Sequence, residues 1–214
     1  MAQNSHTRVW IFDLDDTLHN ASAHIFPVMN RAMTLYIMAS LILDETAAHR
    51  LRQHYWRIYG ATLKGLMRHH SADPHHFLHE THKLPDLSAM VLPVKRLRHM
   101  LQNLPGRKLV FTNAPRNYAL RVLELLGIAD CFELVFSVES TKFYAKPSVR
   151  GFQMLLKAIK VKASDCVMLE DNLAALMTAK RLGMKTIWVS RKLQKPNFVD
   201  YRLSEVLALT HLKL

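Results

Sequence analysis

The stretch Val9-Trp10-Ile11-Phe12-Asp13-Leu14-Asp15-Asp16-Thr17-Leu18 joins a short apolar run to three acidic residues within four positions. The apolar run is typical of a buried β-strand, and the acidic residues lie where that strand gives way to a loop. Acidic residues often end a strand or cap a following helix, so the cluster by itself also has a purely structural interpretation. In an extended segment Asp13 and Asp15 project to the same side, so one carboxylate can act on a substrate atom while the other handles a proton.

Outside this stretch the hydrophobic pattern alternates between strand-length runs and helical segments. Runs of β-branched and aromatic residues recur along the chain at residues 8–12, 108–112, 134–138, 166–169 and 186–190. Amphipathic helical segments separate the later runs, at residues 115–127, 148–159 and 172–182. Because parallel neighbours need crossover connections, this order predicts an α/β fold, a Rossmann-like parallel sheet with helices on both faces.

Roughly 95 residues separate the first predicted strand from the second, and they contain no convincing strand pattern. Apolar residues have helical spacing in two segments, at residues 25–39 and 51–66. We therefore predict a helical cap subdomain at residues 19–92, inserted into an α/β core made of residues 1–18 and 93–214. A cap inserted after the first strand lies over the carboxyl ends of the strands, where ligands bind in open α/β folds.

Polar residues also follow the later predicted strands. Thr112 and Asn113 follow the second strand, a Glu170-Asp171 pair follows the fourth, and Lys146 precedes a helix. The carboxyl ends of parallel strands meet at one edge, so these groups are expected beside the first acidic cluster. Crowded carboxylates repel one another, and an all-oxygen site of this kind suits Mg²⁺. Lys146, the Thr112 hydroxyl and the Asn113 backbone N–H can then hold phosphate oxygens and stabilise charge that develops at phosphorus.

Together these motifs resemble the haloacid dehalogenase superfamily, whose phosphatases share an Asp-x-Asp-x-Thr start, a Thr or Ser after the second strand, a Lys and a late acidic pair. The resemblance covers nearly the whole chain, and the helical insertion is similar to the family's C1-type cap. It implies that Asp13 is the nucleophile, forming an aspartyl-phosphate, and that Asp15 protonates the leaving oxygen and later activates water. It also implies a phosphoryl site at Thr112 and Lys146 and a Mg²⁺ site made by the Asp13 side chain, the Asp15 backbone carbonyl, Asp171 and Glu170.

Two positions refine this resemblance. After the acidic pair the family often carries Ser and, three residues later, Asp or Asn, whereas this chain has Asn172 and Ala175. Asp15 argues against the hydrolytic dehalogenase branch, because a leaving halide needs no proton. A phosphatase and a phosphomutase use the same core residues, so that choice stays open, as does the choice of a sugar phosphate or phosphoglycolate as substrate.

The cap resembles that of the pyrimidine 5′-nucleotidase branch. This resemblance rests on Tyr59-Gly60-Ala61-Thr62-Leu63-Lys64-Gly65-Leu66 and Leu84-Pro85, with further likeness at residues 111–114 and 126–128. It implies hydrolysis of a nucleoside monophosphate, UMP or CMP, to a nucleoside and phosphate. The cap would then hold the base with a flat apolar wall and polar groups, although packing within the cap is the alternative for each aromatic residue. The candidates for substrate contact are His19, Phe26, Tyr55, Tyr59 and Lys64.

Charge and histidine content suggest two further alternatives. The chain carries 29 Lys and Arg against 17 Asp and Glu, a net charge of +12, so anionic partners are the first to be considered. A nucleic-acid-binding protein is the alternative from a different class, but the sequence has no helix-turn-helix spacing, RNP-type strand or zinc-finger ligand set. His75, His79 and His82 share one face of a predicted helix and permit a metal site, while a solvated helix face is the simpler interpretation.

Secretory and membrane segments are not expected. The first eight residues are polar, and the longest apolar run, residues 36–43, is far shorter than the roughly 20 residues that a membrane span requires. Cys131 and Cys166 lack the spacing of a metal or redox motif, so we expect reduced thiols. We therefore predict a cytoplasmic enzyme, a monomer or a homodimer, that acts on small phosphorylated substrates without membrane or nucleic-acid partners.

Overall fold

A computed structural model describes residues 8–212 and confirms the predicted α/β fold. Six parallel strands form one sheet in the order β3-β2-β1-β4-β5-β6. They are β1 (Val9–Phe12), β2 (Arg107–Phe111), β3 (Leu134–Phe136), β4 (Cys166–Glu170), β5 (Lys185–Val189) and β6 (Tyr201–Leu203). The sequence pattern predicts the first five. It misses β6, which is three residues long and has one buried residue, too few to show the alternation of a strand.

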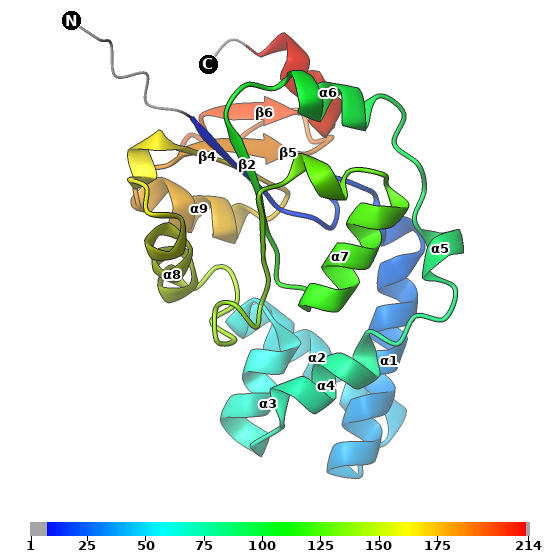
Figure 1. Ribbon diagram of the computed structural model, residues 1–214. Helices are drawn as coiled ribbons and strands as arrows, with labels where there is room; N and C mark the ends of the chain where they lie inside the picture. Colours follow the sequence, from blue (N-terminus) through cyan, green and yellow to red (C-terminus); the bar gives the residue numbers. More distant parts are fainter. Residues whose placement is uncertain (1–7, 213–214) are drawn as a thin grey trace, which may run out of the picture.

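Different helices cover the two faces of the sheet (Figure 1). Along β1, Trp10 and Phe12 point to one face and Val9 and Ile11 to the other, as a side-chain period of two requires. The first face packs against α6 and α7, and the second against α8 and α9. These helices are α6 (Leu97–Asn103), α7 (Arg116–Leu125), α8 (Val149–Ile159) and α9 (Leu173–Arg181). Helices on both faces explain why β1 is buried along its whole length.

Four helices form the cap, which lies below the sheet in Figure 1. They are α1 (Ile25–Leu41), α2 (Glu45–Tyr59), α3 (Thr62–His70) and α4 (Pro74–Thr81), and the short α5 (Leu87–Met90) follows them. The helical spacing predicted over residues 51–66 belongs to two helices, because Gly60 adopts a left-handed φ of 76° and ends α2. α3 then packs so closely on α2 that a Cβ atom on Gly65 would lie 2.1 Å from Cγ of Tyr55.

Three further sequence expectations concern the start of the chain, membrane spans and the two cysteines. The polar residues 1–7, where we expect no secretory signal, lie outside the described residues. Within residues 8–212, no single helix is long and apolar enough to cross a membrane; α1 and α2 meet that length and composition only as a pair, which is bent by 111°. Cys131 and Cys166 are free thiols, and burial raises the pKa of Cys166 to about 12.

Candidate active site

The central strands end at the same edge of the sheet and carry polar residues there. β1 lies between β2 and β4, and its last residue, Phe12, pairs with Val110 on one side and Leu169 on the other. The next residue, Asp13, donates its backbone N–H to the Leu169 carbonyl at 2.9 Å, which continues the ladder by one position. This bond places Asp13 beside Glu170, the last residue of β4.

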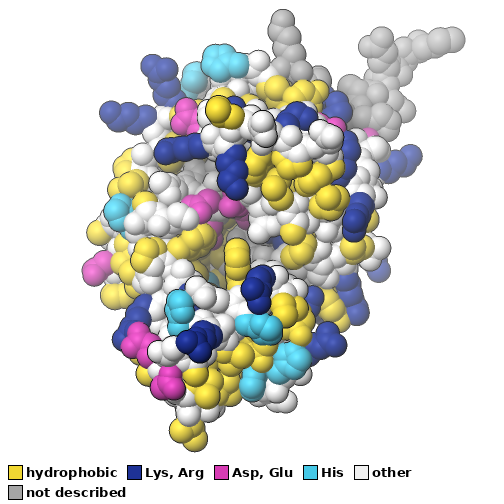
Figure 2. Space-filling model, turned by 180° about the vertical axis from the view of Figure 1, so that it is seen from behind, with side chains coloured by type: hydrophobic (Ala, Val, Ile, Leu, Met, Phe, Trp, Pro, Cys, Tyr) yellow, Lys and Arg dark blue, Asp and Glu magenta, His cyan; other side chains and the backbone are white. Residues whose placement is uncertain are grey.

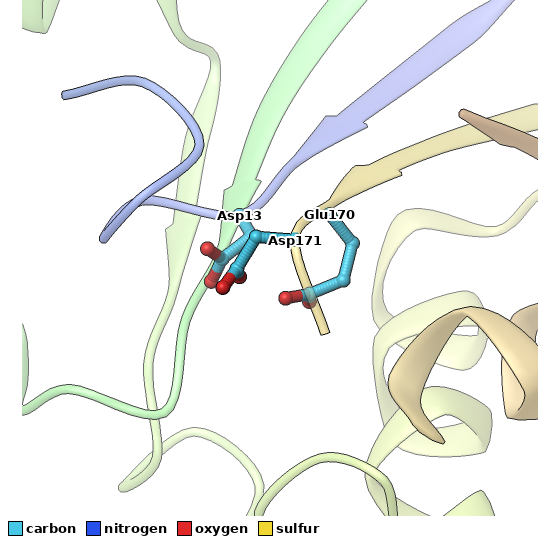
Figure 3. A group of neighbouring side chains, drawn as sticks. All are labelled: Asp13, Glu170 and Asp171. Carbon is cyan, nitrogen blue, oxygen red and sulfur yellow. The ribbon is translucent and has the colours of Figure 1, made fainter. Parts of the chain in front are cut away.

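Three carboxylates gather at this edge, from Asp13, Glu170 and Asp171. One oxygen of each lies within 4.8 Å of the others, and the side chains point toward one another (Figure 3). Asp13 and Glu170 are buried, and Asp171 is half-buried. Within residues 8–212, no other three acidic, His or Cys side chains come together in this way. The structure therefore joins the acidic residues that follow the first and fourth predicted strands.

Lys146 brings positive charge into this cluster. Its Nζ atom lies 2.7 Å from Asp13 Oδ1 and 2.5 Å from Glu170 Oε2, and its side chain is 4% exposed. The Asn113 side chain holds the Lys146 backbone: Oδ1 accepts from the Lys146 N–H at 2.7 Å, and Nδ2 donates to the Lys146 carbonyl at 2.9 Å. From the sequence we consider only the backbone N–H of Asn113; in the structure its side chain also links the end of β2 to the lysine loop.

The cluster holds more negative charge than one ammonium group balances. Burial raises the pKa of Asp13 to about 7, and the charge of Glu170 adds to the shift. Burial also raises the pKa of Glu170 to about 7 and that of Asp171 to about 6. Burial by itself lowers the pKa of Lys146, but the Asp13 and Glu170 carboxylates more than offset this and hold its pKa above the usual value. Three carboxylates around one lysine therefore favour an added cation.

Asp15 receives two hydrogen-bond donors on one of its oxygens. The Tyr118 O–H donates to Asp15 Oδ1 at 2.7 Å, and His19 Nε2 lies 3.0 Å from the same atom. Because a carboxylate oxygen accepts, the His19 tautomer that fits this contact carries its proton on Nε2. Burial, followed by the charge of Asp15, raises the pKa of Tyr118, so the phenol remains a donor. With Oδ1 bound twice, Oδ2 is the oxygen left for a substrate.

His19 and Tyr118 occupy positions that the sequence pattern does not indicate. From the sequence we consider His19 for substrate contact at the mouth of the site, but the structure buries it behind Asp15. Tyr118 is absent from the predicted site residues. Its one sequence signal is its place with Ala119 and Val122 on the apolar face of α7, which core packing explains equally well.

The carboxylate edge forms one end of a cavity of about 480 Å³ between the core and the cap. Acidic side chains are visible inside this hollow in Figure 2. One face of α1 lines the cavity at helical spacing, with Phe26, Met29, Asn30 and Met33. α2 contributes Arg52, Gln53 and Trp56. The volume and the mixture of apolar and polar walls are typical of a site for a small molecule.

The predicted site residues fall into two groups by position. Those that line the cavity are Asp13, Asp15, Phe26, Lys64, Thr112, Asn113, Lys146, Glu170 and Asp171. His19, Tyr55 and Tyr59 do not line it. The Tyr55 O–H is 2.7 Å from His70 Nε2, and the Tyr59 O–H is 2.6 Å from His69 Nε2. These contacts join α2 to α3, so both tyrosines hold these two helices of the cap together, and neither lines this cavity.

The histidines of α4 do not gather into a metal site within the described part of the chain. His75 packs edge-on against Phe143 with 5.1 Å between ring centroids, and the side chain of His79 is 69% exposed. His82 lies edge-on to Tyr118 at 5.6 Å. The three rings therefore face different surroundings, and His82 lies just after the end of α4 and not on the predicted helix face.

Asp171 is supported by groups other than those of the family pattern. The Asn172 side chain accepts from the Ala174 and Ala175 N–H groups and so caps α9. Trp188 donates from Nε1 to the Asp171 carbonyl at 2.8 Å. The backbone at Asp171 is therefore fixed by a helix cap on one side and by a side chain of β5 on the other.

Comparisons of the chain's sequence with known proteins identify a family and several relatives. A family model for haloacid dehalogenase-like hydrolases matches residues 7–183. The chain is 27% identical over 194 residues to phosphate metabolism protein 8 of Saccharomyces cerevisiae, covering 83% of this chain and 60% of the yeast protein's length. It is 28% identical over 203 residues to glyceraldehyde 3-phosphate phosphatase of Pyrococcus abyssi, covering 85% of this chain and 80% of that protein.

A solved structure shows the same fold. The HAD phosphatase from Thermococcus onnurineus is similar with a TM-score of 0.67 at 18% identity, covering 95% of this chain and 96% of that chain. Identity at this level supports the fold alone. The family model, however, spans most of the chain and includes Asp13, Lys146 and Asp171. The chain therefore belongs to the haloacid dehalogenase-like hydrolase family.

Proposed function

We propose that this chain is a phosphomonoester hydrolase that works through an aspartyl-phosphate on Asp13. The observation that carries the proposal is the buried contact between Asp13 Oδ1 and Lys146 Nζ, 2.7 Å apart, at the core end of a cavity that Asp15 also lines. A carboxylate nucleophile, a cation that can hold a phosphoryl oxygen and a second carboxylate for proton transfer are the groups that hydrolysis of a phosphate ester uses.

The reaction divides into two displacements at phosphorus. In the first, an Asp13 oxygen attacks phosphorus, the bond from phosphorus to the leaving oxygen breaks, and Asp15 gives that oxygen a proton. In the second, Asp15 takes a proton from water, the water oxygen attacks phosphorus, and Asp13 and inorganic phosphate separate. Lys146 and the Thr112 hydroxyl hold phosphoryl oxygens in both displacements and stabilise their charge. The hydrogen bonds on Asp15 Oδ1 keep its carboxylate in place for both proton transfers.

Mg²⁺ is the cofactor that fits these residues. Asp13, Asp171 and the Asp15 backbone carbonyl would hold it, with Glu170 beside them. The fit rests on an all-oxygen donor set and on carboxylates whose pKa values are raised by burial and by one another, so that positive charge is in short supply. When bound, the ion neutralises charge on the nucleophile and on the phosphate, so that two anions can approach each other.

For the substrate we propose a pyrimidine nucleoside monophosphate, UMP or CMP. The cap wall of the cavity combines flat apolar side chains, Phe26 and Trp56, with the polar Gln53 and Lys64, a combination that suits a base with carbonyl groups. A small sugar phosphate is the second candidate, because the Pyrococcus relative is named as a phosphatase of glyceraldehyde 3-phosphate. A phosphomutase would use the same core residues and pass the phosphoryl group to a sugar hydroxyl.

Phosphate release from a panel of esters tests this proposal. We expect faster release from UMP and CMP than from AMP, glucose phosphates and phosphoglycolate, with loss of activity in EDTA and recovery with Mg²⁺. In Asp13→Asn turnover should fall by at least about 10³-fold, because the amide keeps the shape but loses the nucleophilic charge. Glu124→Gln, exposed on α7, is the control and should keep the wild-type rate. Full turnover in Asp13→Asn contradicts the mechanism, and equal rates across the panel contradict the nucleotide assignment.

A further inference from the structure

Arg52 of α2 lines the cap wall of the cavity with part of its hydrogen-bonding capacity unused. Its Nη1 atom donates to Asn30 Oδ1 at 2.7 Å. Its Nε atom is buried and has no hydrogen-bond partner within residues 8–212. The exposed Arg31, on the neighbouring helix α1, is by contrast paired with Glu45. Arg52 is therefore a cation that faces a cavity and still has a donor to satisfy.

The unused donor has no explanation within the packing of the cap. Buried donors in native proteins are nearly always bonded, and a guanidinium group cannot avoid the cost by losing its proton. Burial lowers the pKa of Arg52, yet the ion pairs of the described residues provide it with no carboxylate. On the same helix Arg50 is exposed to solvent. The position of Arg52 thus points to a ligand group that would complete its hydrogen bonds.

The free edge of this guanidinium group has a defined shape. With Nη1 bound to Asn30, the Nε–H and one Nη2–H remain side by side on one edge of the plane. Such an edge matches two adjacent acceptor atoms, as when arginine binds O6 and N7 of guanine. Since Asn30 uses its Oδ1 atom to accept from Arg52, its Nδ2 group adds another donor. This part of the cap therefore offers a ligand donors and no acceptors from these two side chains.

The walls around this edge favour a planar group over a second phosphate. Phe26, Met33 and Trp56 line the same side of the cavity. A dianion among apolar side chains would lose hydration that one guanidinium group replaces only in part. Because Nε is closed to solvent in the described chain, a flat group with two adjacent acceptors that lies against these walls reaches both N–H groups only after the Arg52 side chain turns toward the cavity.

We propose that Arg52, supported by Asn30, forms a leaving-group subsite for a pair of adjacent hydrogen-bond acceptors. This rests on the proposed function, because it places the phosphate at the carboxylate end of the same cavity and the rest of the ester at the cap. In a pyrimidine nucleotide the matching pair is O2 and N3 of cytosine. Uracil carries a hydrogen on N3 and so lacks the second acceptor on that edge. A carboxylate on the leaving group offers an equivalent pair.

Arg52→Gln and Arg52→Lys test the subsite, with Arg50→Gln as the matched control on the exposed side of α2. The substrates are CMP, UMP, phosphoglycolate, which carries a carboxylate, and phenyl phosphate, whose ring has no acceptor. In Arg52→Gln we expect kcat/KM for CMP to fall roughly tenfold to a hundredfold, as for hydrogen bonds to a charged group, while phenyl phosphate stays within about twofold. Arg52→Lys keeps the positive charge but lacks the edge with two N–H groups, so kcat/KM for CMP should fall in this variant as well. Thermal unfolding verifies that the variants fold.

The outcomes separate the subsite from the proposed function. A selective loss for phosphoglycolate in place of CMP keeps the subsite and identifies a carboxylate as its ligand. If kcat/KM falls equally for all four esters, or falls for neither CMP nor phosphoglycolate, the subsite is overturned. If the wild-type chain hydrolyses none of the esters, the proposed function fails. Calorimetric titration with CMP then tests the Arg52 subsite by binding, without any need for turnover. Weaker binding to Arg52→Gln than to Arg50→Gln then supports the subsite, and equal or absent binding overturns it.

Discussion

The two ends of the cavity differ in how completely their polar groups are paired. At the core end Lys146 binds two carboxylates, Asn113 binds the Lys146 backbone at two atoms, and Asp15 receives two donors. At the cap end Arg52 has one side-chain bond, to Asn30, and a buried Nε atom without a partner in the described chain. The core groups that line the cavity are thus bonded to one another before a ligand arrives, and the unpaired His19 Nδ1 and Thr17 Oγ1 atoms belong to side chains that do not line it. At the cap end the unpaired atom belongs to a side chain of the cavity wall.

This difference follows from the elements that carry each end. The core groups lie at the ends of neighbouring strands, whose spacing is fixed by the ladder of β1 with β2 and β4. Groups held in this way need no ligand to reach their working distances. The cap groups lie on two helices and gain by completing their bonds to a ligand. A substitution at the core end should therefore slow the hydrolysis of every ester, whereas a substitution at the cap end should change which ester is hydrolysed fastest.

Lys146→Gln should have the largest effect and should act on all substrates alike. It removes the cation expected to hold a phosphoryl oxygen and leaves the buried Asp13 and Glu170 carboxylates without their partner. We expect kcat/KM to fall by about 10²- to 10³-fold for UMP and for phenyl phosphate. Lys142→Gln, at an exposed position of the same loop, should keep the wild-type value. A loss confined to one ester would place Lys146 in recognition and would break the distinction between the two ends.

His82 lies where the two ends meet, after the last turn of α4 and edge-on to Tyr118 of α7. Burial lowers the pKa of His82 to about 4 from an ordinary value of 6.5, although its bond to the Leu78 carbonyl and the charges of Asp15 and Glu139 act in the opposite direction. Between these values the unfolded chain binds a proton that the folded chain does not. The His82 contribution to stability is therefore lost as the pH falls from about 6.5 toward about 4.

Urea unfolding of the wild type and of His82→Gln measures this contribution. The variant cannot bind the proton, so the difference in unfolding free energy between the two proteins should change by about 2 kcal/mol between pH about 7.5 and pH about 5, with the wild type losing more. His79→Gln, on the exposed side of α4, should leave the pH dependence of the wild type unchanged. A constant difference would mean that the His82 ring reaches water and that the border between cap and core is open.

The core end could be predicted from the sequence because its residues lie at strand ends. Once the strands are known to be parallel, Asp13, Thr112 and Glu170 must lie at one edge, whatever their side-chain conformations. The two side-chain bonds of Asn113 could not be predicted in this way, since they depend on the path of the loop that carries Lys146. Strand ends therefore predict which residues meet but not all the bonds between them.

The cap end could be predicted only as helices. Helical spacing indicates that Tyr55 faces a neighbour but does not say which one, and Gly65 lets α3 come close enough to cover its ring. Gly60 divides a segment whose apolar spacing runs on without interruption. Arg52 could not be distinguished from Arg50 or Arg57 in the sequence, because what sets it apart is that its Nε atom is buried without a hydrogen-bond partner in the described chain, whereas Arg50 and Arg57 are exposed.

Tyr118→Phe should have the smallest effect and should show whether the pairing at the core end contributes to the chemistry. The variant loses the O–H that donates to Asp15 Oδ1 but keeps the ring that packs in α7. His19 still contacts the same oxygen, so kcat/KM for UMP, whose leaving oxygen needs a proton, should fall only about tenfold. Tyr144→Phe is the matched control, because the Tyr144 hydroxyl oxygen accepts from Arg150 and contacts none of the site carboxylates.

The ester p-nitrophenyl phosphate makes this test specific, because p-nitrophenolate leaves without a proton. The value of kcat/KM reports the steps up to and including the first displacement. For p-nitrophenyl phosphate it should therefore fall by no more than about twofold in Tyr118→Phe. If Tyr118 acted through packing alone, kcat/KM would fall equally for both esters, because the substitution would disturb Asp13 and Lys146 as much as Asp15. Unequal losses would assign Tyr118 to the placement of the proton donor, and the paired hydrogen bonds of the core end would then be part of catalysis as well as of stability.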